Sequence, residues 1–243
     1  MKNIKLIVAY DGTNYHGFQL QQNAVTVQEK LEQAMQTVFR EPVRLTAAGR
    51  TDTGVHALGQ VVTVQVKTGV PTDRIPYALN ATLPRDIVVS SAEVMPDNFH
   101  ARFSVKSKVY RYTIDNAPYP RVLQRLYSLH VRYPLDLELM QQAAMTLVGR
   151  HDFTSFMASG SSVKTTVRHL TRLDVSEQDG FYTITAEANG FLYNMVRIIA
   201  GTLIEVGRHK RSPELGSVIC AGSRMAAGWT APAYGLVMLE VKY

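Results

Sequence analysis

A length of 243 residues, with 46% hydrophobic and 19% charged side chains, is typical of a globular protein built as one elongated unit or two coupled lobes. The formal net charge of +6 suits a polyanionic partner, and most of the excess lies after residue 103, where sixteen Lys and Arg face eleven Asp and Glu. A membrane span is not expected, because Arg197 and Glu205 interrupt the best apolar run, and a signal peptide is not expected, because no cleavage region follows the start. An internal disulfide is not expected either, because Cys220 is the one cysteine. We therefore expect a cytoplasmic protein.

The first part of the chain reads as alternating strands and helices. Residues 2–10 alternate in polarity, which predicts a strand. A helix is expected to begin at Thr26, whose side chain with Glu29 forms a capping box, and to end before Pro42. Further strands are expected at 43–48, 61–66 and 87–94, with a short helix at 73–81.

The second part repeats this order of elements. Residues 108–115 alternate and predict a strand, and Asp136 can cap a helix that ends near Gly149. Residues 191–206 predict a long apolar helix, and Ser212-Pro213 the start of another. The remaining strands are expected at 168–176, 181–189 and 237–243.

These elements predict an α/β protein of the α+β type, with two similar lobes sharing a mixed, mainly antiparallel sheet flanked by helices. The strands alternate in polarity and are not apolar throughout, which argues against a buried parallel sheet. We place the boundary so that residues 1–103 form an N-terminal lobe and residues 104–243 a C-terminal lobe.

A polar, glycine-flanked segment, Gly49-Arg-Thr-Asp-Thr-Gly54, lies between two expected strands. Loops held between strands often carry functional residues, but Asp, Thr and Gly are also ordinary turn formers. The spacing matches neither a P-loop nor a dinucleotide fingerprint, so it indicates no nucleotide cofactor. At this point Asp52 is either a turn residue or a candidate carboxylate for chemistry.

Arg197 lies in a helix that is apolar almost all round. An arginine there either reaches the surface or is buried and needs a carboxylate partner. Its helical neighbours three or four positions away are Tyr193, Asn194, Ala200 and Gly201. Because none of these is acidic, we hypothesise that Asp52 is the partner and that the pair keeps the Asp52 carboxylate ionised.

Basic residues gather in clusters after residue 100. Strand alternation places Lys108, Tyr110 and Tyr112 on one face. Aromatic rings beside cations suit base stacking and phosphate attraction, but the pattern taken alone favours a half-buried strand with amphipathic tyrosines. Solvated surface is the alternative reading of the clusters. They comprise Arg102, Lys106, Lys108 and Arg111; Lys164, Arg168 and Arg172; and Arg208, Lys210 and Arg211.

Other chemistries lack their signatures. The histidines, including His56, His100, His151 and His169, show no metal-like spacing with one another or with Cys220. No Gly-x-Ser-x-Gly elbow or cysteine-nucleophile context is present. Metal-dependent and serine-hydrolase chemistry are therefore not expected.

The chain resembles the bacterial tRNA pseudouridine synthase A (TruA) family over essentially its whole length. Ten segments carry the resemblance in the same order, at residues 9–19 (AYDGTNYHGFQ), 26–32 (TVQEKLE), 48–57 (AGRTDTGVHA), 80–84 (NATLP), 99–104 (FHARFS), 109–112 (VYRY), 151–156 (HDFTSF), 188–197 (ANGFLYNMVR), 207–214 (GRHKRSPE) and 230–236 (TAPAYGL). The chain departs from the commonest family form at Thr53, where the family usually has alanine.

The resemblance implies an isomerase that converts uridine to pseudouridine at positions 38, 39 and 40 of the tRNA anticodon arm. It implies a homodimer in which each tRNA contacts both subunits, with no cofactor and no metal. Asp52 would be the essential carboxylate, paired with Arg197. Tyr110 would pack against the target base, Arg50 would help to extrude the nucleotide, and Leu236 would line the uracil pocket.

Several alternatives stay open at this level. Asp52 can attack ribose C1′ or deprotonate C2′, and Tyr110 can act as a base or only stack, the former needing a shift from its ordinary pKa near 10. A paralogue with different uridine specificity, a non-catalytic tRNA-binding protein and a small-molecule α/β enzyme are the rival functions.

Overall fold

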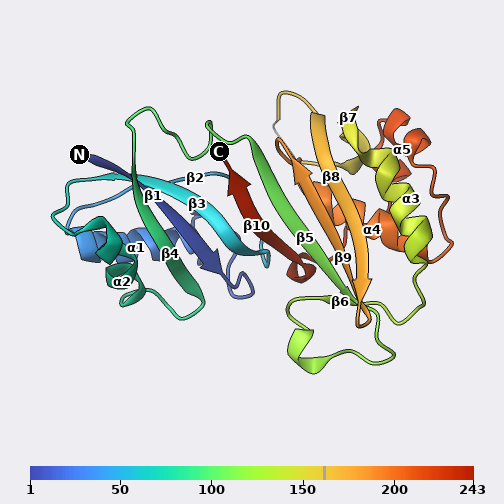
Figure 1. Ribbon diagram of the computed structural model, residues 1–243, viewed down its shortest axis with the longest axis horizontal. Coiled ribbons are helices and arrows are strands. Elements are labelled where there is room, and N and C mark those ends of the chain that lie inside the picture. The colour runs from blue at the N-terminus through green and yellow to red at the C-terminus, as the bar shows by residue number, and fades with distance from the viewer. Residues whose placement is uncertain (161–162) are drawn as a thin grey trace. The chain divides into compact units, whose positions relative to one another are not determined.

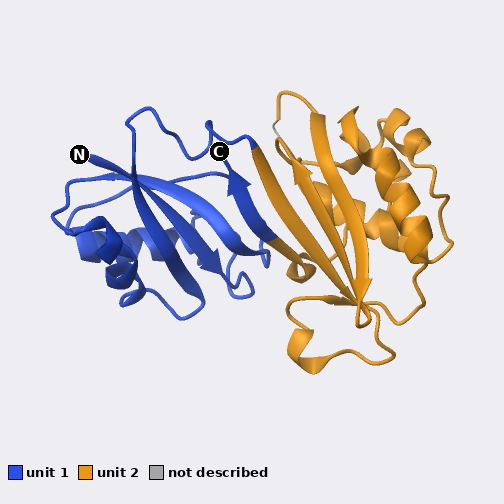
Figure 2. Cartoon of the chain, in the orientation of Figure 1, with its two compact units in different colours: residues 1–106, 238–243 blue, residues 107–237 orange. Residues whose placement is uncertain are grey.

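The computed structural model describes residues 1–160 and 163–243 (Figure 1). They form two compact units, coloured separately in Figure 2: unit 1 comprises Met1–Lys106 and Met238–Tyr243, and unit 2 comprises Ser107–Val237. The predicted boundary followed residue 103, whereas unit 1 continues to Lys106. The last six residues, which the predicted boundary assigns to the C-terminal lobe, belong to unit 1, because β10 pairs with a strand of that unit.

The sheet of unit 1 has the strand order β4 (Ile87–Met95), β1 (Lys2–Tyr10), β3 (His56–Val66) and β10 (Leu236–Lys242), with the short β2 (Thr46–Ala47) also paired to β3. Strand β1 is antiparallel to both neighbours, with Ile4 opposite Val64 on one side and Val94 on the other. Its alternation buries Ile4, Leu6 and Val8, as the sequence pattern predicts.

The helices of unit 1 are α1 (Val27–Phe39) and α2 (Ile75–Asn80), the latter preceded by the 3₁₀ turn η1 (Thr72–Arg74). The predicted N-cap of α1 is confirmed, because the Thr26 side chain accepts the N–H of Glu29 at 3.3 Å. The helix ends as Arg40 enters the left-handed region with φ 58°, before Pro42 as expected.

Two predicted strands of unit 1 are wrong in their limits. The strand expected at 43–48 is reduced to β2, and the strand expected from residue 61 begins at His56. The cause is β1, which pairs along its whole length and places Tyr10 opposite Ala57. The segment Gly49–Gly54 therefore lies wholly in the loop between β2 and β3, and this loop ends at Val55.

The sheet of unit 2 has the antiparallel order β5 (Ser107–Asp115), β9 (Phe181–Ala188), β8 (Val167–Gln178) and β7 (Gly149–Asp152). The short β6 (Leu129–His130) pairs with β5 in parallel. Its α-helices are α3 (Leu137–Leu147), α4 (Met195–Gly207) and α5 (Gly216–Cys220). Short 3₁₀ turns are η2 (Val122–Gln124), η3 (Thr154–Phe156), η4 (Arg224–Ala226) and η5 (Ala233–Gly235).

The predicted cap of α3 is confirmed, since Asp136 Oδ1 accepts the N–H of Leu139 at 3.1 Å. Helix α4 begins at Met195 and not at residue 191, because Asn194 is left-handed with φ 60°. Helix α5 begins at Gly216, later than the expected start at Ser212-Pro213. There the Ser212 side chain accepts the N–H of Glu214 and makes a turn first.

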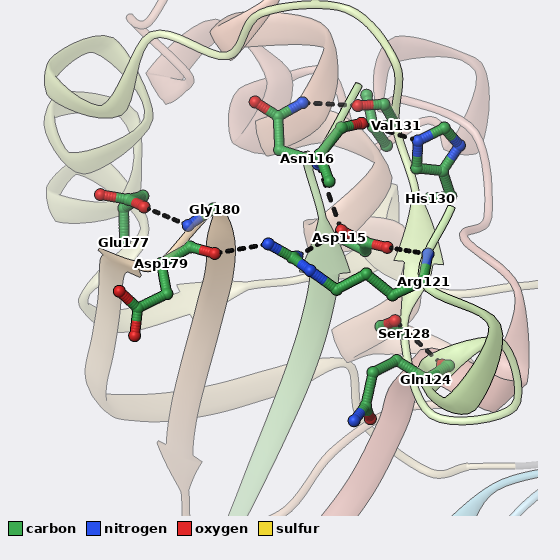
Figure 3. A network of polar contacts seen from close by, with 11 residues as sticks. Asp115, Asn116, Arg121, Gln124, Ser128, His130, Val131, Glu177, Asp179 and Gly180 are labelled. Carbon is green, nitrogen blue, oxygen red and sulfur yellow. Dashed lines mark hydrogen bonds and ion pairs between the residues drawn. The ribbon is translucent and has the colours of Figure 1, made fainter. Parts of the chain in front are cut away.

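The long connection between β5 and α3, which the sequence did not predict, is fixed by a polar network (Figure 3). The buried Asp115 carboxylate accepts the backbone N–H groups of Ala117 and Arg121 and pairs with Arg121 Nη1 at 2.6 Å. Arg121 also donates to the Asp179 carbonyl oxygen, and its guanidinium lies 4.1 Å from the centre of the Phe181 ring. One arginine therefore ties the connection to the β8–β9 hairpin.

The predicted fold class, a mixed α/β protein with mainly antiparallel strands flanked by helices, is confirmed. Among residues 1–160 and 163–243, no helix is long and apolar enough to cross a membrane.

Candidate active site

Asp52 lies on the turn between β2 and β3 in unit 1, and its side chain is half-buried. The turn is held by backbone hydrogen bonds from the segment that follows β1. The N–H of Phe18 donates to the Thr51 carbonyl at 3.1 Å, and the N–H of Gly54 donates to the Tyr15 carbonyl at 3.3 Å. Main-chain hydrogen bonds on both sides of Asp52 thus fix the position of its backbone, from which the side chain extends.

Two glycines after β1 permit this close approach. A Cβ at Gly12 would lie 2.1 Å from the Val55 carbonyl oxygen, and a Cβ at Gly17 would lie 2.7 Å from that of Thr51. Gly17 also has φ +82°, which disfavours other residues. The segment 9–19 therefore serves as a backbone support for the Asp52 turn.

Side chains beneath the turn add to this support. Tyr10 Oη and Thr51 Oγ1 form a buried hydrogen bond of 2.8 Å, and Gln60 Nε2 donates to the Gly49 carbonyl at 2.9 Å. Burial raises the pKa of the Tyr10 phenol far above its ordinary value, so Tyr10 stays protonated. Thr51, which precedes Asp52, is fixed in both main chain and side chain.

His56 is buried beside the same turn and contacts the segment that follows β1, a role that no local sequence pattern indicates. Its Nδ1 lies 3.0 Å from the Gly12 nitrogen and 3.1 Å from Asp11 Oδ1. One ring nitrogen cannot accept the Gly12 N–H and donate to Asp11 at once. We assign acceptance, because the backbone amide can only donate.

Arg197 occupies the first turn of α4 in unit 2 and is half-buried. Its Nη1 donates to Asn194 Oδ1 and its Nε to the Ala231 carbonyl, each at 2.7 Å. The N–H of Ala231 in turn donates to the Arg197 carbonyl at 3.1 Å. The guanidinium is therefore oriented by the helix cap and by the chain that leads to Leu236, so it is not simply an arginine reaching out to the surface.

Tyr110 and Tyr112 project from β5 on the face that alternation predicted. Tyr110 is 7% exposed and meets the Phe191 ring edge-on, with centroids 5.1 Å apart. Tyr112 Oη donates to the Pro232 carbonyl at 3.0 Å, and burial raises the pKa of its phenol. A Cβ at Gly235 would lie 2.6 Å from the Tyr112 ring, so this glycine lets the chain pass.

The structure thus groups the predicted site residues into two sets. Asp52 and the exposed Arg50 lie on the motif turn of unit 1. In unit 2, the residues 231–236 run beside Tyr112 and Arg197 and end at the buried Leu236. The pairing of Asp52 with Arg197 would join the two sets, and it stays a prediction.

Several residues of the predicted basic clusters have local partners. Arg211 pairs with Glu205 at 2.9 Å, and Arg172 pairs with Asp174. Arg168 donates to the carbonyls of Thr165 and Val167 at its own strand end. Lys164 and the other members gain no assigned role from these contacts. In the part of the chain that the structure describes, no group of three His, Cys, Asp or Glu residues is placed to hold a metal ion.

Comparisons with known proteins identify the family. A family model described as tRNA pseudouridine synthase matches residues 6–104 and 143–243. Proteins named tRNA pseudouridine synthase A from Thermoanaerobacter sp. (strain X514) and Acetivibrio thermocellus are each 49% identical over 244 residues, and that from Brevibacillus brevis is 48% identical, all covering 100% of both chains. A solved chain of a Cbf5-Nop10-Gar1 complex overlaps 96% of this chain and 57% of its own, at 10% identity and a TM-score of 0.35, which is too low to support an argument. The chain belongs to the tRNA pseudouridine synthase A family.

Proposed function

We propose that this protein isomerises uridine to pseudouridine in tRNA, at positions 38, 39 and 40 of the anticodon arm, with Asp52 acting on the ribose of the target nucleotide. The observation that carries the proposal is full-length identity of 49% to enzymes named tRNA pseudouridine synthase A. The geometry supports it, because Asp52 is the one acidic residue of a turn held by main-chain contacts.

The reaction explains why a carboxylate is needed. The C1′–N1 bond breaks, the uracil rotates, a C1′–C5 bond forms, and the C5 proton leaves while N1 gains one, so atoms balance without a co-reactant. Asp52 acts either as the nucleophile at C1′ or as the base at C2′. The base must first leave its stack, at a cost of a few kcal/mol.

Other residues take the binding roles in this proposal. Arg50, exposed on the motif turn, occupies the space of the extruded nucleotide. Tyr110 offers a ring to the target base, and Leu236 lines the uracil pocket. Arg197, already oriented by Asn194 and Ala231, pairs with Asp52 and keeps that carboxylate ionised.

The test is to incubate the protein with unmodified tRNA and map pseudouridine by nucleotide. We expect pseudouridine at positions 38, 39 and 40 with the wild type and none with Asp52→Ala. Pseudouridine at other positions would indicate a paralogue with different specificity. Binding of tRNA without any pseudouridine would instead indicate a non-catalytic tRNA-binding protein.

The role of Tyr110 has its own test. Tyr110→Phe keeps the ring and removes the hydroxyl. Full retention of the single-turnover rate would establish stacking as the role. A large loss of rate at unchanged tRNA affinity would instead assign proton removal from C5 to the phenol.

We also propose a cytoplasmic homodimer in which each tRNA contacts both subunits. The connection between β5 and α3 supports a contact surface, because it is fixed by Arg121 yet exposes Tyr119 (84%), Val122 (70%) and Leu123 (82%). Exposed apolar patches often mark interfaces. Light scattering should give a dimer for the wild type and a monomer for Val122→Lys combined with Leu123→Glu. A wild-type monomer would contradict this part of the proposal.

A further inference from the structure

A pocket of about 460 Å³ lies in unit 2 where α4 ends and α3 begins. It is lined by residues 133–136 and 208–210. The N–H of Asp136 donates to the Gly207 carbonyl at 2.8 Å, which joins the two lining segments. Arg197 lies at the opposite end of α4, so the pocket belongs to a different part of the unit from the candidate active-site residues.

Three cationic side chains gather around one partly exposed aromatic ring at this pocket. The Arg208 guanidinium lies 4.1 Å from the centre of the Tyr133 ring, and that of Arg132 lies 4.8 Å from it. Arg132 Nη2 also donates to Tyr133 Oη at 2.6 Å. The pKa of the Tyr133 phenol is lowered mainly by this hydrogen bond and by the charge of Arg132, with smaller contributions from the charges of Arg208 and Lys210. Arg208 and Lys210 both line the pocket beside Tyr133.

The opposing charges at the pocket are smaller. The Asp136 carboxylate caps α3 and lies 3.6 Å from His209 Nε2. The carbonyl end of α4 adds about half a negative charge. Three full positive charges therefore outweigh one carboxylate and a helix end. Arg211 is left out of this count because Glu205 neutralises it.

We propose that this pocket binds a phosphate group of the RNA substrate, with Arg208 and Lys210 contacting the phosphate and the Tyr133 ring orienting the Arg208 guanidinium that lies over it. The inference rests on the proposed function for its ligand. Guanidinium groups match phosphate oxygens in bidentate geometry, and a guanidinium held against an aromatic ring is already oriented for such a contact.

The length of α4 sets how far the pocket lies from Arg197. Eleven positions separate Arg197 from Arg208, which corresponds to about 16 Å along a helix axis. In double-stranded DNA, charges along one strand are spaced by about 3.4 Å of axis, which gives the scale of this distance in nucleotides. The phosphate bound here lies several nucleotides from a uridine held near Arg197, so the pocket contributes affinity and not chemistry.

The experiment measures the Kd for unmodified tRNA at several salt concentrations for the wild type and for Arg208→Ala combined with Lys210→Ala. We expect the variant to bind about tenfold more weakly near physiological salt, and its slope of log K against log salt to fall by about 1 to 2, since each lost phosphate contact removes about 0.7 to 0.9. Arg208→Lys, which keeps the charge, should retain most of the slope.

Arg74→Ala is the matched control. Arg74 is an exposed arginine that lies over the Tyr77 ring at 5.9 Å, but Asp73 stands 3.5 Å from its Nε. Its removal should leave both Kd and slope unchanged. Thermal unfolding of each variant separates a folding defect from a binding defect, and a destabilised double variant would be replaced by Arg208→Gln with Lys210→Gln.

The possible outcomes separate this inference from the proposed function. An unchanged Kd and slope in the double variant would overturn the pocket's role, even if the wild type makes pseudouridine. A reduced slope in a protein that makes no pseudouridine would support the pocket and contradict the proposed function. Inorganic phosphate that protects the wild type against unfolding, without any change in tRNA binding between variants, would assign the pocket to a free anion and overturn the RNA proposal.

Discussion

The two units hold their candidate site residues in different ways. In unit 1 the turn that carries Asp52 is fixed mainly by main-chain hydrogen bonds and by glycines that let two backbones touch. In unit 2 Arg197 and Tyr112 are fixed by their own side-chain bonds to the carbonyls of Ala231 and Pro232. The Asp52 carboxylate is thus positioned by the backbone that carries it, whereas the Arg197 guanidinium and the Tyr112 phenol are positioned by hydrogen bonds of their own polar groups.

This difference suits the chemistry proposed for each set. A nucleophile or base must sit within a few tenths of an ångström of one ribose atom, and a rigid main chain achieves that. Residues that bind the target base or pair with a carboxylate need a correctly oriented side chain more than a fixed backbone. We therefore expect the site residues of unit 1 to be displaced by changes in the backbone, and those of unit 2 by the loss of single polar groups.

The largest effect is expected for Gly12→Ala. The new Cβ would lie 2.1 Å from the Val55 carbonyl, where neither backbone can move freely, so the free energy of unfolding should fall by more than about 3 kcal/mol. Gly69→Ala is the control, because nothing lies within 4 Å of its Cβ position. Urea unfolding of both variants provides the measurement. Equal stabilities would show that the turn is not fixed by close backbone approach.

Arg197→Ala tests whether side-chain hydrogen bonds position the site residues of unit 2. It leaves the Ala231 carbonyl without its Arg197 donor, which should cost about 1 to 3 kcal/mol of stability, and it should also lower the single-turnover rate by about 10². Arg224→Ala is the matched control, since Arg224 donates to the Gly228 carbonyl at 2.7 Å and to Thr230 Oγ1 at 3.0 Å. It should lose similar stability but keep its rate when folded. If both variants kept their rates, Arg197 would be merely structural.

A smaller pair of effects compares the two units directly. Tyr10→Phe removes the bond to Thr51, and Tyr112→Phe removes the bond to the Pro232 carbonyl. Each should cost about 1 kcal/mol in the free energy of unfolding. Tyr77→Phe, at a side chain that is 71% exposed, should cost nothing measurable. A larger loss of activity for Tyr10→Phe than for Tyr112→Phe would support the closer coupling of Tyr10 to the Asp52 turn.

The same two tyrosines predict a loss of stability at alkaline pH. Burial raises the pKa of both phenols above the ordinary value near 10, so the folded protein keeps protons that the unfolded chain releases. Their contribution is complete below about pH 10 and falls as the pH rises further. Urea midpoints measured from about pH 8 to 11 should fall less steeply in the Tyr10→Phe, Tyr112→Phe double variant. Identical slopes in both proteins would contradict the assignment.

Local patterns in the sequence were enough to predict the elements that local chemistry determines. The caps Thr26 and Asp136 are confirmed, as is the alternation of β1 and β5. The predictions were wrong where pairing or a local turn decides, as at the start of β3 and at Asn194 before α4. The connection fixed by Arg121 could not be predicted, because its partners Asp115 and Asp179 lie on different strands or turns.

The candidate site was predicted in a similarly partial way. Asp52 and Arg197 were singled out from the sequence, but the supports around Asp52 were not. Gly12 and Gly17 could have been noticed as glycines in a short segment, although what their missing Cβ atoms would meet is set by the fold. The bond between Tyr10 and Thr51 spans 41 positions and has no local signal.

In the proposed reaction, Asp52 performs the chemistry while other residues bind the RNA. The most direct test measures, for Asp52→Asn on the same unmodified tRNA, both the single-turnover rate of pseudouridine formation and the Kd. We expect pseudouridine formation to be lost while the Kd stays within about threefold of the wild type, because phosphate contacts supply most of the affinity. A variant that still forms pseudouridine at the wild-type rate would contradict it.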